Sequence, residues 1–223
     1  MNTDGTAVRA HQVRLDGPRG AVFGPIDLEV PAGRATALVS PAQSGRTSLL
    51  LALTGRMAPT AGELVVLGEH LPRHVRRVQQ ATALANFHGI DTLDEGLRVS
   101  ELVNERAGLL VPMWRRPAWF GEPAVSAVFT TVYGDDAVPR GDLQIWHLPP
   151  VDVARLRVVL ALLGRPRLIA VDDVDSLRNP ADQVALWSSL DRVADTGATV
   201  VAAASSFGAI TSHINVVHLE AHA

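Results

Sequence analysis

The sequence predicts an α/β fold built on a parallel β-sheet, and two features of the chain indicate it. First, residues 148–223 alternate between apolar runs of strand length and longer helical stretches, which is typical of a parallel sheet whose two faces are covered. Second, an apolar run at 35–39 is followed by a loop of small residues and then by an apolar helical run at 49–53. Strand, loop and helix in that order form the setting in which a phosphate-binding loop works.

The N-terminal segment is expected to form antiparallel strands. Within residues 7–30, short apolar pieces alternate with Gly and Pro, which predicts two strands joined by a turn at the edge of an antiparallel sheet. Residues 63–67 form a further predicted strand, after a loop at 55–62. Residues 71–80 carry Arg and His side chains, which fit either a basic helix or, as we favour, an ordinary solvated face.

Residues 98–150 combine helical stretches with irregular loops and are predicted to form a small helical subdomain. Residues 99–110 have the apolar spacing of a helix, and a second helix is expected at 124–132. Between them lies an aromatic and proline-broken loop at 111–121, and a further loop is expected at 134–141.

The C-terminal part of the chain is predicted to supply most of the parallel sheet. The run Leu168–Val171 is apolar throughout, as expected of a strand that is buried on both faces. The pair Asn179-Pro180 fits a helix cap followed by proline in the first turn. The elements expected here are helices at 153–163 and 181–194 and strands at 168–171, 199–204 and 215–219.

Composition limits the function. A chain of 223 residues, 47% of them hydrophobic, suits one domain with a sizeable core. A formal net charge of −3 argues against electrostatic binding of nucleic acid, and the absence of cysteine excludes disulfides and thiolate metal sites. The N-terminus lacks the basic and apolar regions of a signal peptide, and no apolar run approaches the ~18 residues that span a bilayer. We therefore expect a cytoplasmic chain.

Residues 40–48 approximate the phosphate-binding (Walker A) pattern G-x-x-x-x-G-K-[S/T]. Ser40 and Gly45 take the two glycine positions, Arg46 takes that of the lysine, and Thr47 takes that of the hydroxyl. In such a loop, amide N–H groups contact phosphate oxygens, the cation neutralises the β- and γ-phosphates, and the hydroxyl binds Mg²⁺. Taken alone, the stretch also fits a plain strand–turn–helix. The other predicted nucleotide-binding residues of the loop are Gln43, Ser44 and Ser48.

Arginine at position 46 has two interpretations. Its guanidinium is planar and forked, so it does not simply replace the compact ammonium of lysine. However, all 20 basic residues of the chain are arginine. The substitution can therefore reflect drift across the whole chain or loss of function at this position.

A second element of phosphate chemistry follows the strand at 168–171. Asp172 is placed to hold Mg²⁺ beside the loop, usually through water, and Asp173 lies where a general base for an attacking water would be. By itself the acidic pair also fits a helix cap or a turn. Together with the loop upstream, it favours a nucleotide site.

With these motifs the chain resembles the ATP-binding cassette (ABC) ATPases, specifically the nucleotide-binding subunits of transporters, over nearly its whole length. The strongest segment is Arg155–Asp173, which looks like the family's signature helix, the turn after it and the second phosphate-site strand. Pro59–Gly62 looks like the family's P-x-x-G turn. Asp172–Pro180 matches the segment through the D-loop, with Asn179 in place of the usual aspartate.

The resemblance implies a P-loop NTPase fold of the ABC type with a RecA-like core. In one nucleotide-binding domain covering residues 1–223, the core would comprise residues 35–58 and 151–223. Residues 1–34 with 60–70 would form an antiparallel β subdomain, and residues from about 90 to 150 the helical subdomain.

The resemblance also identifies positions at which the chain departs from the family. Asn86 stands nearest to the family's glutamine, Leu148–Asp152 aligns with the signature L-S-G-G-Q, Asp173 with the catalytic glutamate and Ser205 with the switch histidine. Two prolines in the signature segment have no N–H to offer a phosphate, although they also fit a helix start. Ser205 cannot carry the positive charge of an imidazole. We therefore expect weak or partner-dependent hydrolysis.

The resemblance implies a subunit that binds ATP and Mg²⁺ and works as a homodimer or as a heterodimer with another ATP-binding subunit. It would lie at the inner face of the membrane through a membrane-spanning transporter subunit. The alternative is an inactive regulatory or scaffold subunit that keeps the fold and binds no nucleotide. A soluble cassette ATPase working on nucleic acid or in cluster assembly is disfavoured by the acidity and the lack of cysteine.

The segment Met113–Phe120 has the composition of a partner interface, because two Trp and a Phe alternate with Arg. In the family, the helical subdomain faces the membrane subunit. The alternative is that these aromatic side chains close the core of the small subdomain.

Overall fold

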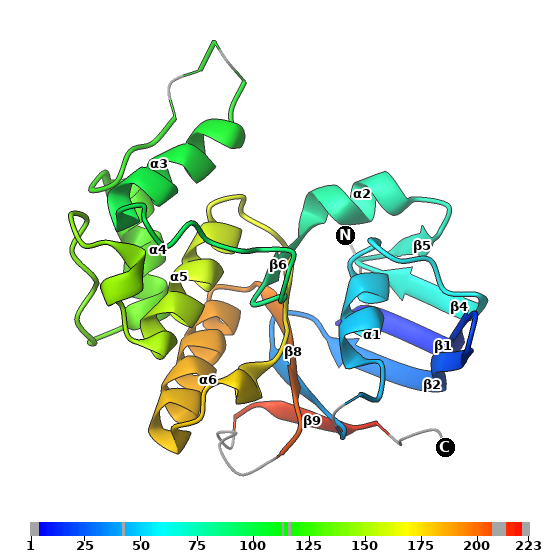
Figure 1. Cartoon of the computed structure of the whole chain (residues 1–223). Helices are drawn as coiled ribbons and strands as arrows, with labels where there is room; N and C mark the ends of the chain where they lie inside the picture. The colour runs from blue at the N-terminus through cyan, green and yellow to red at the C-terminus, as the bar shows by residue number, and fades with distance from the viewer. Residues whose placement is uncertain (1–4, 42, 113, 116, 207–212, 220–223) are drawn as a thin grey trace.

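The computed structural model describes residues 5–41, 43–112, 114–115, 117–206 and 213–219, and it contains two β-sheets (Figure 1). The larger sheet is parallel and has five strands in the order β6-β7-β8-β3-β9. These strands are β3 (Ala35–Val39), β6 (Thr82–Ala85), β7 (Leu168–Val171), β8 (Thr199–Ala204) and β9 (Asn215–His218). The predicted α/β fold class is confirmed.

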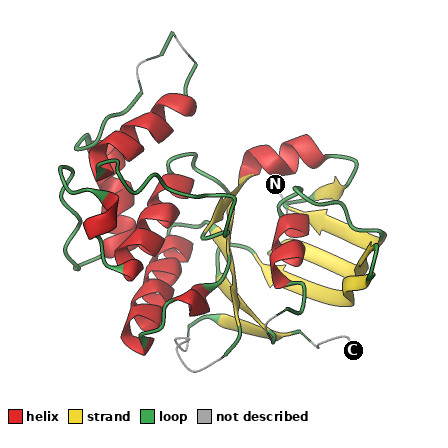
Figure 2. Ribbon diagram, in the orientation of Figure 1, coloured by secondary structure: helices red, strands yellow, loops and turns green. Residues whose placement is uncertain are grey.

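The central strands of this sheet are buried on both faces. All four residues of β7 are buried, as its unbroken apolar run predicts. Ile169 and Val171 pack with the helices on one face, whereas Leu168 and Ala170 pack on the other face, because side chains alternate along a strand. Figure 2 shows most of the helices gathered on one side of this sheet and the second sheet on the other side.

The second sheet is antiparallel, with four strands in the order β2-β1-β4-β5. Its strands are β1 (Thr6–Gly17), β2 (Gly20–Pro31), β4 (Ala61–Val66) and β5 (Glu69–Leu71). Helix α1 (Arg46–Leu53) lies between the two sheets: its Leu49, Leu50 and Leu53 are buried in one cluster with side chains from both. This packing fixes the start of α1 beside the carboxyl ends of the parallel strands.

The remaining helices follow the predicted order closely. Pro180 begins α6, and the side chain of Asn179 accepts a hydrogen bond from the Ala181 N–H at 3.0 Å, so the predicted cap is confirmed. The elements are α2 (Val75–Ala81), α3 (Val99–Leu109), α4 (Pro123–Tyr133), a 3₁₀ turn at Ile145–His147, α5 (Pro150–Leu162), a 3₁₀ turn at Val174–Ser176 and α6 (Pro180–Asp195).

Short elements are the ones that the sequence did not specify. Strand β5 and the turn at 145–147 have three residues each, too few for a periodic signal. Within 71–80, the basic stretch forms α2 and buries only Val78 among its residues. Of the helices in the described ranges, none combines the length and hydropathy needed to cross a bilayer. The division into subdomains stays a prediction.

Candidate nucleotide-binding site

The loop after β3 enters α1 through a glycine that no other residue can replace without strain. Gly45 has φ +79° and is the N-cap of α1. A Cβ built on it would lie 2.1 Å from the carbonyl oxygen of Val22 in β2. Because glycine has no capping side chain, the first N–H groups of α1 stay available to an anion. The positions predicted for this loop thus lie at a helix N-terminus.

The first part of the loop is held by serine side chains. Ser40 is buried, its N–H donates to the Ala204 carbonyl at the end of β8, and its hydroxyl lies 2.6 Å from that of Ser44. Gln43 is exposed and has φ +65°. Ala42, between Ser40 and Gln43, lies outside the described residues. The hydroxyl pair joins the two sides of the loop.

The structure brings the loop and the end of β7 together. The Thr47 hydroxyl donates a hydrogen bond of 2.5 Å to Oδ2 of Asp172, and the Asp173 N–H donates to Oδ1 of the same carboxylate at 2.9 Å. Asp172 is itself buried. A hydroxyl and a carboxylate oxygen are ligands that Mg²⁺ accepts, with water and substrate phosphates completing its shell. These two residues therefore fit the predicted metal position.

Asp173 lies next to this pair in an uncommon backbone conformation. Its φ of +47° is left-handed, which Asp tolerates better than most residues. Burial raises the pKa of the Asp173 carboxyl, the neighbouring Asp172 raises it further, and Arg46 lowers it. A carboxyl whose pKa is raised by burial and a like charge suits a general base.

Arg46 is paired with an acid that the sequence did not single out. Its Nη1 lies 3.6 Å from Oδ2 of Asp175, in the 3₁₀ turn after β7. The same carboxylate accepts a hydrogen bond from the backbone N–H of Ser205, which follows β8. The sequence offers only a weak signal for this pairing, namely that Asp175 is a third acidic residue, two positions after Asp173.

Asn86 follows β6 at the same edge of the sheet. Its side-chain oxygen accepts from Arg157 of α5 at 3.4 Å, and its N–H donates to Asp91 at 2.6 Å. Asn86 is therefore tied to α5 and to the segment after β6. Ser48 lies within the first turn of α1.

The segment aligned with the signature and the aromatic loop differ in their contacts. Pro149 is the N-cap of α5 and Pro150 its first residue, so these prolines start a helix, as the structural interpretation expects. In the aromatic loop, Phe120 packs edge-on against Phe129 with ring centroids 5.6 Å apart, whereas Trp114 is 85% exposed and Trp119 is 45% exposed. Met113 and Arg116 of that loop lie outside the described residues.

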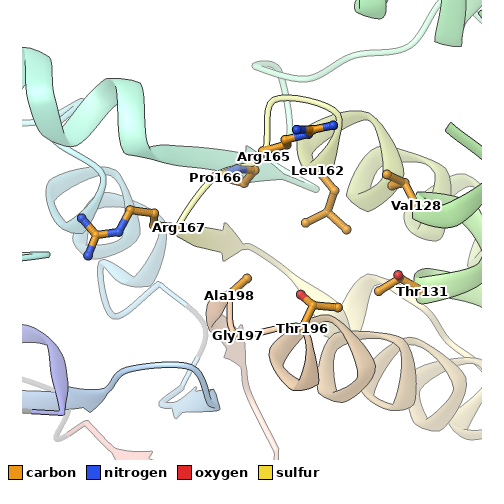
Figure 3. A pocket seen from close by; sticks show the side chains of 9 residues that line it. All are labelled: Val128, Thr131, Leu162, Arg165, Pro166, Arg167, Thr196, Gly197 and Ala198. Carbon is orange, nitrogen blue, oxygen red and sulfur yellow. The ribbon is translucent and has the colours of Figure 1, made fainter. Parts of the chain in front are cut away.

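A separate cavity of 320 Å³ lies at the amino ends of β7 and β8, the edge of the sheet opposite the loop (Figure 3). Arg165 and Arg167 extend from its rim in different directions. The hydroxyls of Thr131 and Thr196 donate to carbonyls of their own helices. Because no polar groups converge here among the described residues, we place the candidate site at the loop.

Comparison with known proteins finds relatives in sequence and in fold. No family model matches the chain. It is 24% identical over 188 residues to the Nod factor export ATP-binding protein I of Cupriavidus metallidurans, covering 79% of this chain and 55% of that protein. It is 26% identical over 200 residues to the hemin import ATP-binding protein HmuV of Pseudomonas fluorescens, covering 87% of this chain and 75% of that protein. The chain thus spans little more than half of the first relative.

Solved structures show the same fold. The cbiO1 protein of Clostridium perfringens, part of the ABC transporter complex cbiONQ, superposes with a TM-score of 0.80 at 12% identity, covering 97% of this chain and 86% of that one. A bacterial Atm1-family ABC exporter with ATP bound superposes with a TM-score of 0.73 at 14% identity, covering 99% of this chain and 38% of the exporter chain. In fold the chain matches ATP-binding cassette ATPase domains, and in sequence it is similar to ATP-binding proteins of export and import systems.

Proposed function

We propose that the chain is the ATP-binding subunit of an ABC transporter and binds Mg-ATP at residues 40–48. The contact between Thr47 and Asp172 carries the proposal, because it joins the loop to the acid at the end of β7. The sequence relatives support it, since they are ATP-binding proteins of export and import systems. Thr47 and Asp172 would hold Mg²⁺, which supplies charge neutralisation at the phosphates.

Arg46 and the start of α1 would bind the phosphates. Nη1 of Arg46 is buried and has no hydrogen-bond partner within the described part of the chain. A buried guanidinium with an unsatisfied donor favours an additional anion, and phosphate is an anion that Arg recognises well. Gly45 would let the backbone approach the phosphate, because a side chain there would collide with β2.

Hydrolysis is proposed to be weak or dependent on a partner. Asp173 would be the base for the attacking water, but its carboxylate is one methylene shorter than a glutamate. Displacement of a catalytic group by about 1 Å can cost about 10²-fold in rate. Ser205, at the end of β8, would supply a hydrogen bond without the charge of an imidazole.

We further propose coupling to a membrane-spanning subunit, which would keep the chain at the inner face of the membrane, and pairing with a second ATP-binding subunit. A groove of 410 Å³ between α3, α5 and the segment at 90–93 supports docking of a partner segment. Its lining includes exposed Leu109 and Ile90, together with the charged Arg157 and Asp91. Apolar side chains around a few charged groups suit a protein interface.

The alternative function is a scaffold subunit that binds no nucleotide. The pairing of Arg46 with Asp175 favours it, because the cation of the loop already has a counter-ion. The hydroxyl contact between Ser40 and Ser44 also joins the two sides of the loop without a ligand.

One measurement distinguishes these functions, and a second tests the proposal of weak hydrolysis. A ligand stabilises only the state that it binds, so Mg-ATP should raise the unfolding temperature of the wild type and not that of Arg46→Ala. An absence of any ATP-dependent shift in the wild type supports the scaffold. Steady-state phosphate release should stay far below the several turnovers per second that are ordinary for enzymes. A rate in that range would overturn the proposal of weak hydrolysis.

A further inference from the structure

Asp175 joins three segments of the site that are far apart in the sequence. It lies in the turn Val174–Ser176, directly after the end of β7. Its Oδ2 is 3.6 Å from Nη1 of Arg46 in the loop and accepts the backbone N–H of Ser205 at the end of β8. The side chains of Arg46 and Asp175 are only 11% and 18% exposed, so solvent screens this pair weakly.

The pairing leaves Arg46 incompletely satisfied. A distance of 3.6 Å is too long for a hydrogen bond. Nη1 of Arg46 is buried, and among the residues that the structure describes it has no hydrogen-bond partner. Asp175 therefore balances the charge of Arg46 and leaves a donor of this guanidinium available to another anion.

We propose that Asp175 is a specificity-determining residue: an internal counter-ion that competes with the terminal phosphate of a nucleoside triphosphate for Arg46. This inference rests on the proposed binding of ATP at the loop. In a phosphate-binding loop, the cation after the second glycine contacts the β- and γ-phosphates. A nearby carboxylate repels those phosphates and competes for the cation, and this cost is greater for a triphosphate than for a diphosphate.

Two other acids of the site do not have this role. Asp172 uses both of its carboxylate oxygens, one toward Thr47 and one toward the N–H of Asp173. Arg46 also acts on Asp173, whose pKa it lowers, but the ion pair of Arg46 is with Asp175. Removing the charge of Asp175 therefore takes away the ion-pair partner of Arg46 and keeps the carboxylates of both Asp172 and Asp173.

Calorimetric titration of ATP and of ADP, both with Mg²⁺, tests the role of Asp175. The chains to compare are the wild type, Asp175→Asn and Asp142→Asn. Asparagine keeps an acceptor for the Ser205 N–H. Asp142 is an exposed acid paired with Arg140 outside the site, so its variant makes the same charge change elsewhere. Asp175→Asn should bind ATP about 10-fold more tightly, with a smaller gain for ADP, and Asp142→Asn should match the wild type.

The outcomes separate this role from the proposed function. If the wild type binds ATP and Asp175→Asn binds it equally or more weakly, Asp175 is not a competitor, although ATP binding stands. Equal gains for ATP and ADP would overturn the selectivity for the terminal phosphate. If no chain binds either nucleotide, the proposed function fails and this role fails with it. Circular dichroism checks folding, and Asp175→Ser replaces the asparagine variant if that one does not fold.

Discussion

The Thr47 hydroxyl donates a hydrogen bond of 2.5 Å to Oδ2 of Asp172, although 125 positions separate the two residues in the chain. Thr47 lies in the first turn of α1, and Asp172 directly follows β7. Because the strands of a parallel sheet end at one edge, residues from distant segments meet there. In this chain, that edge holds a hydroxyl, a carboxylate and a cation together.

Removing the Thr47 hydroxyl should weaken Mg-ATP binding. The hydroxyl is one of the two proposed protein ligands of Mg²⁺, and loss of even an outer-shell partner of a metal ligand costs about 10–100-fold in metal affinity, so Thr47→Ala should raise the dissociation constant by about 10-fold or more. Calorimetric titration with Mg²⁺ and with a chelator measures the effect, and the variant should depend less on Mg²⁺. Thr47→Ser keeps the hydroxyl and serves as the control. Equal losses of Mg-ATP affinity in Thr47→Ala and Thr47→Ser would show that binding does not depend on the hydroxyl.

A side chain at Gly45 should disrupt the loop. Its Cβ would meet the Val22 carbonyl at 2.1 Å, and its φ of +79° is strained for other residues. Left-handed backbone costs about 1–2 kcal/mol and overpacking a further 1–3 kcal/mol or so. Urea unfolding of Gly45→Ala should therefore show a loss of several kcal/mol.

Gly121 provides the matched control for Gly45. It also has a positive φ, +89°, but a Cβ there meets nothing within 4 Å. Gly121→Ala should show the backbone cost alone and leave nucleotide binding unchanged. A stability loss in Gly121→Ala as large as that in Gly45→Ala would contradict a role for the contact with β2.

Lengthening the predicted base should speed hydrolysis. Asp173→Glu extends the carboxylate by one methylene, and a change of about 1 Å can alter the rate by about 10²-fold. Because Asp173 has a φ of +47°, the glutamate should also cost about 1 kcal/mol of stability. Phosphate release at saturating Mg-ATP measures the rate. Asp173→Asn keeps the shorter side chain and removes the base. Equal rates of phosphate release in Asp173→Glu and Asp173→Asn would show that the length of the Asp173 side chain does not limit hydrolysis.

Asp91 should make stability depend on pH. Burial raises the pKa of the Asp91 carboxyl above its ordinary 3.8, against the lowering effects of Arg157 and of N–H donors. The folded state thus favours the protonated form. The stability that this form contributes is present below pH 3.8 and is lost as the pH rises through the folded pKa. Asp91→Asn should therefore gain stability relative to the wild type between acidic and neutral pH.

Asp142 should behave in the opposite way and serves as the control. The hydrogen bond and charge of Arg140 lower the pKa of the Asp142 carboxyl. Its contribution is present above pH 3.8 and is lost as the pH falls through the folded pKa, so Asp142→Asn should lose stability relative to the wild type at neutral pH. Urea unfolding at several pH values measures both variants. If both variants changed in stability in the same direction relative to the wild type, the burial of Asp91 would be contradicted.

The fold was largely predictable because its signals are local. The apolar run at 168–171 becomes a strand with every residue buried. The pair Asn179-Pro180 caps α6 because a side-chain acceptor and a proline suit the first turn of any helix. Such preferences depend on neighbours in the sequence, so the order of the longer elements follows from the sequence, whereas bounds such as the start of α5 at Pro150 differ from those predicted.

The partners of the site residues were less predictable because they depend on tertiary packing. Arg46 could be assigned to the loop, but its pairing with Asp175 depends on how the turn 174–176 lies against α1. Likewise, Arg157 reaches Asn86 only because α5 packs beside β6. No spacing in the sequence encodes these contacts, since the residues of each pair come from different elements.

Calorimetric titration of Mg-ATP into the purified chain tests most directly whether residues 40–48 form a nucleotide site. The geometry of Thr47, Asp172 and Arg46 predicts binding within the range of about 1 μM to 1 mM that is ordinary for enzymes and their substrates, and Arg46→Ala should abolish it. No heat of binding up to millimolar Mg-ATP, from a chain shown to be folded, would contradict a nucleotide site and favour the scaffold.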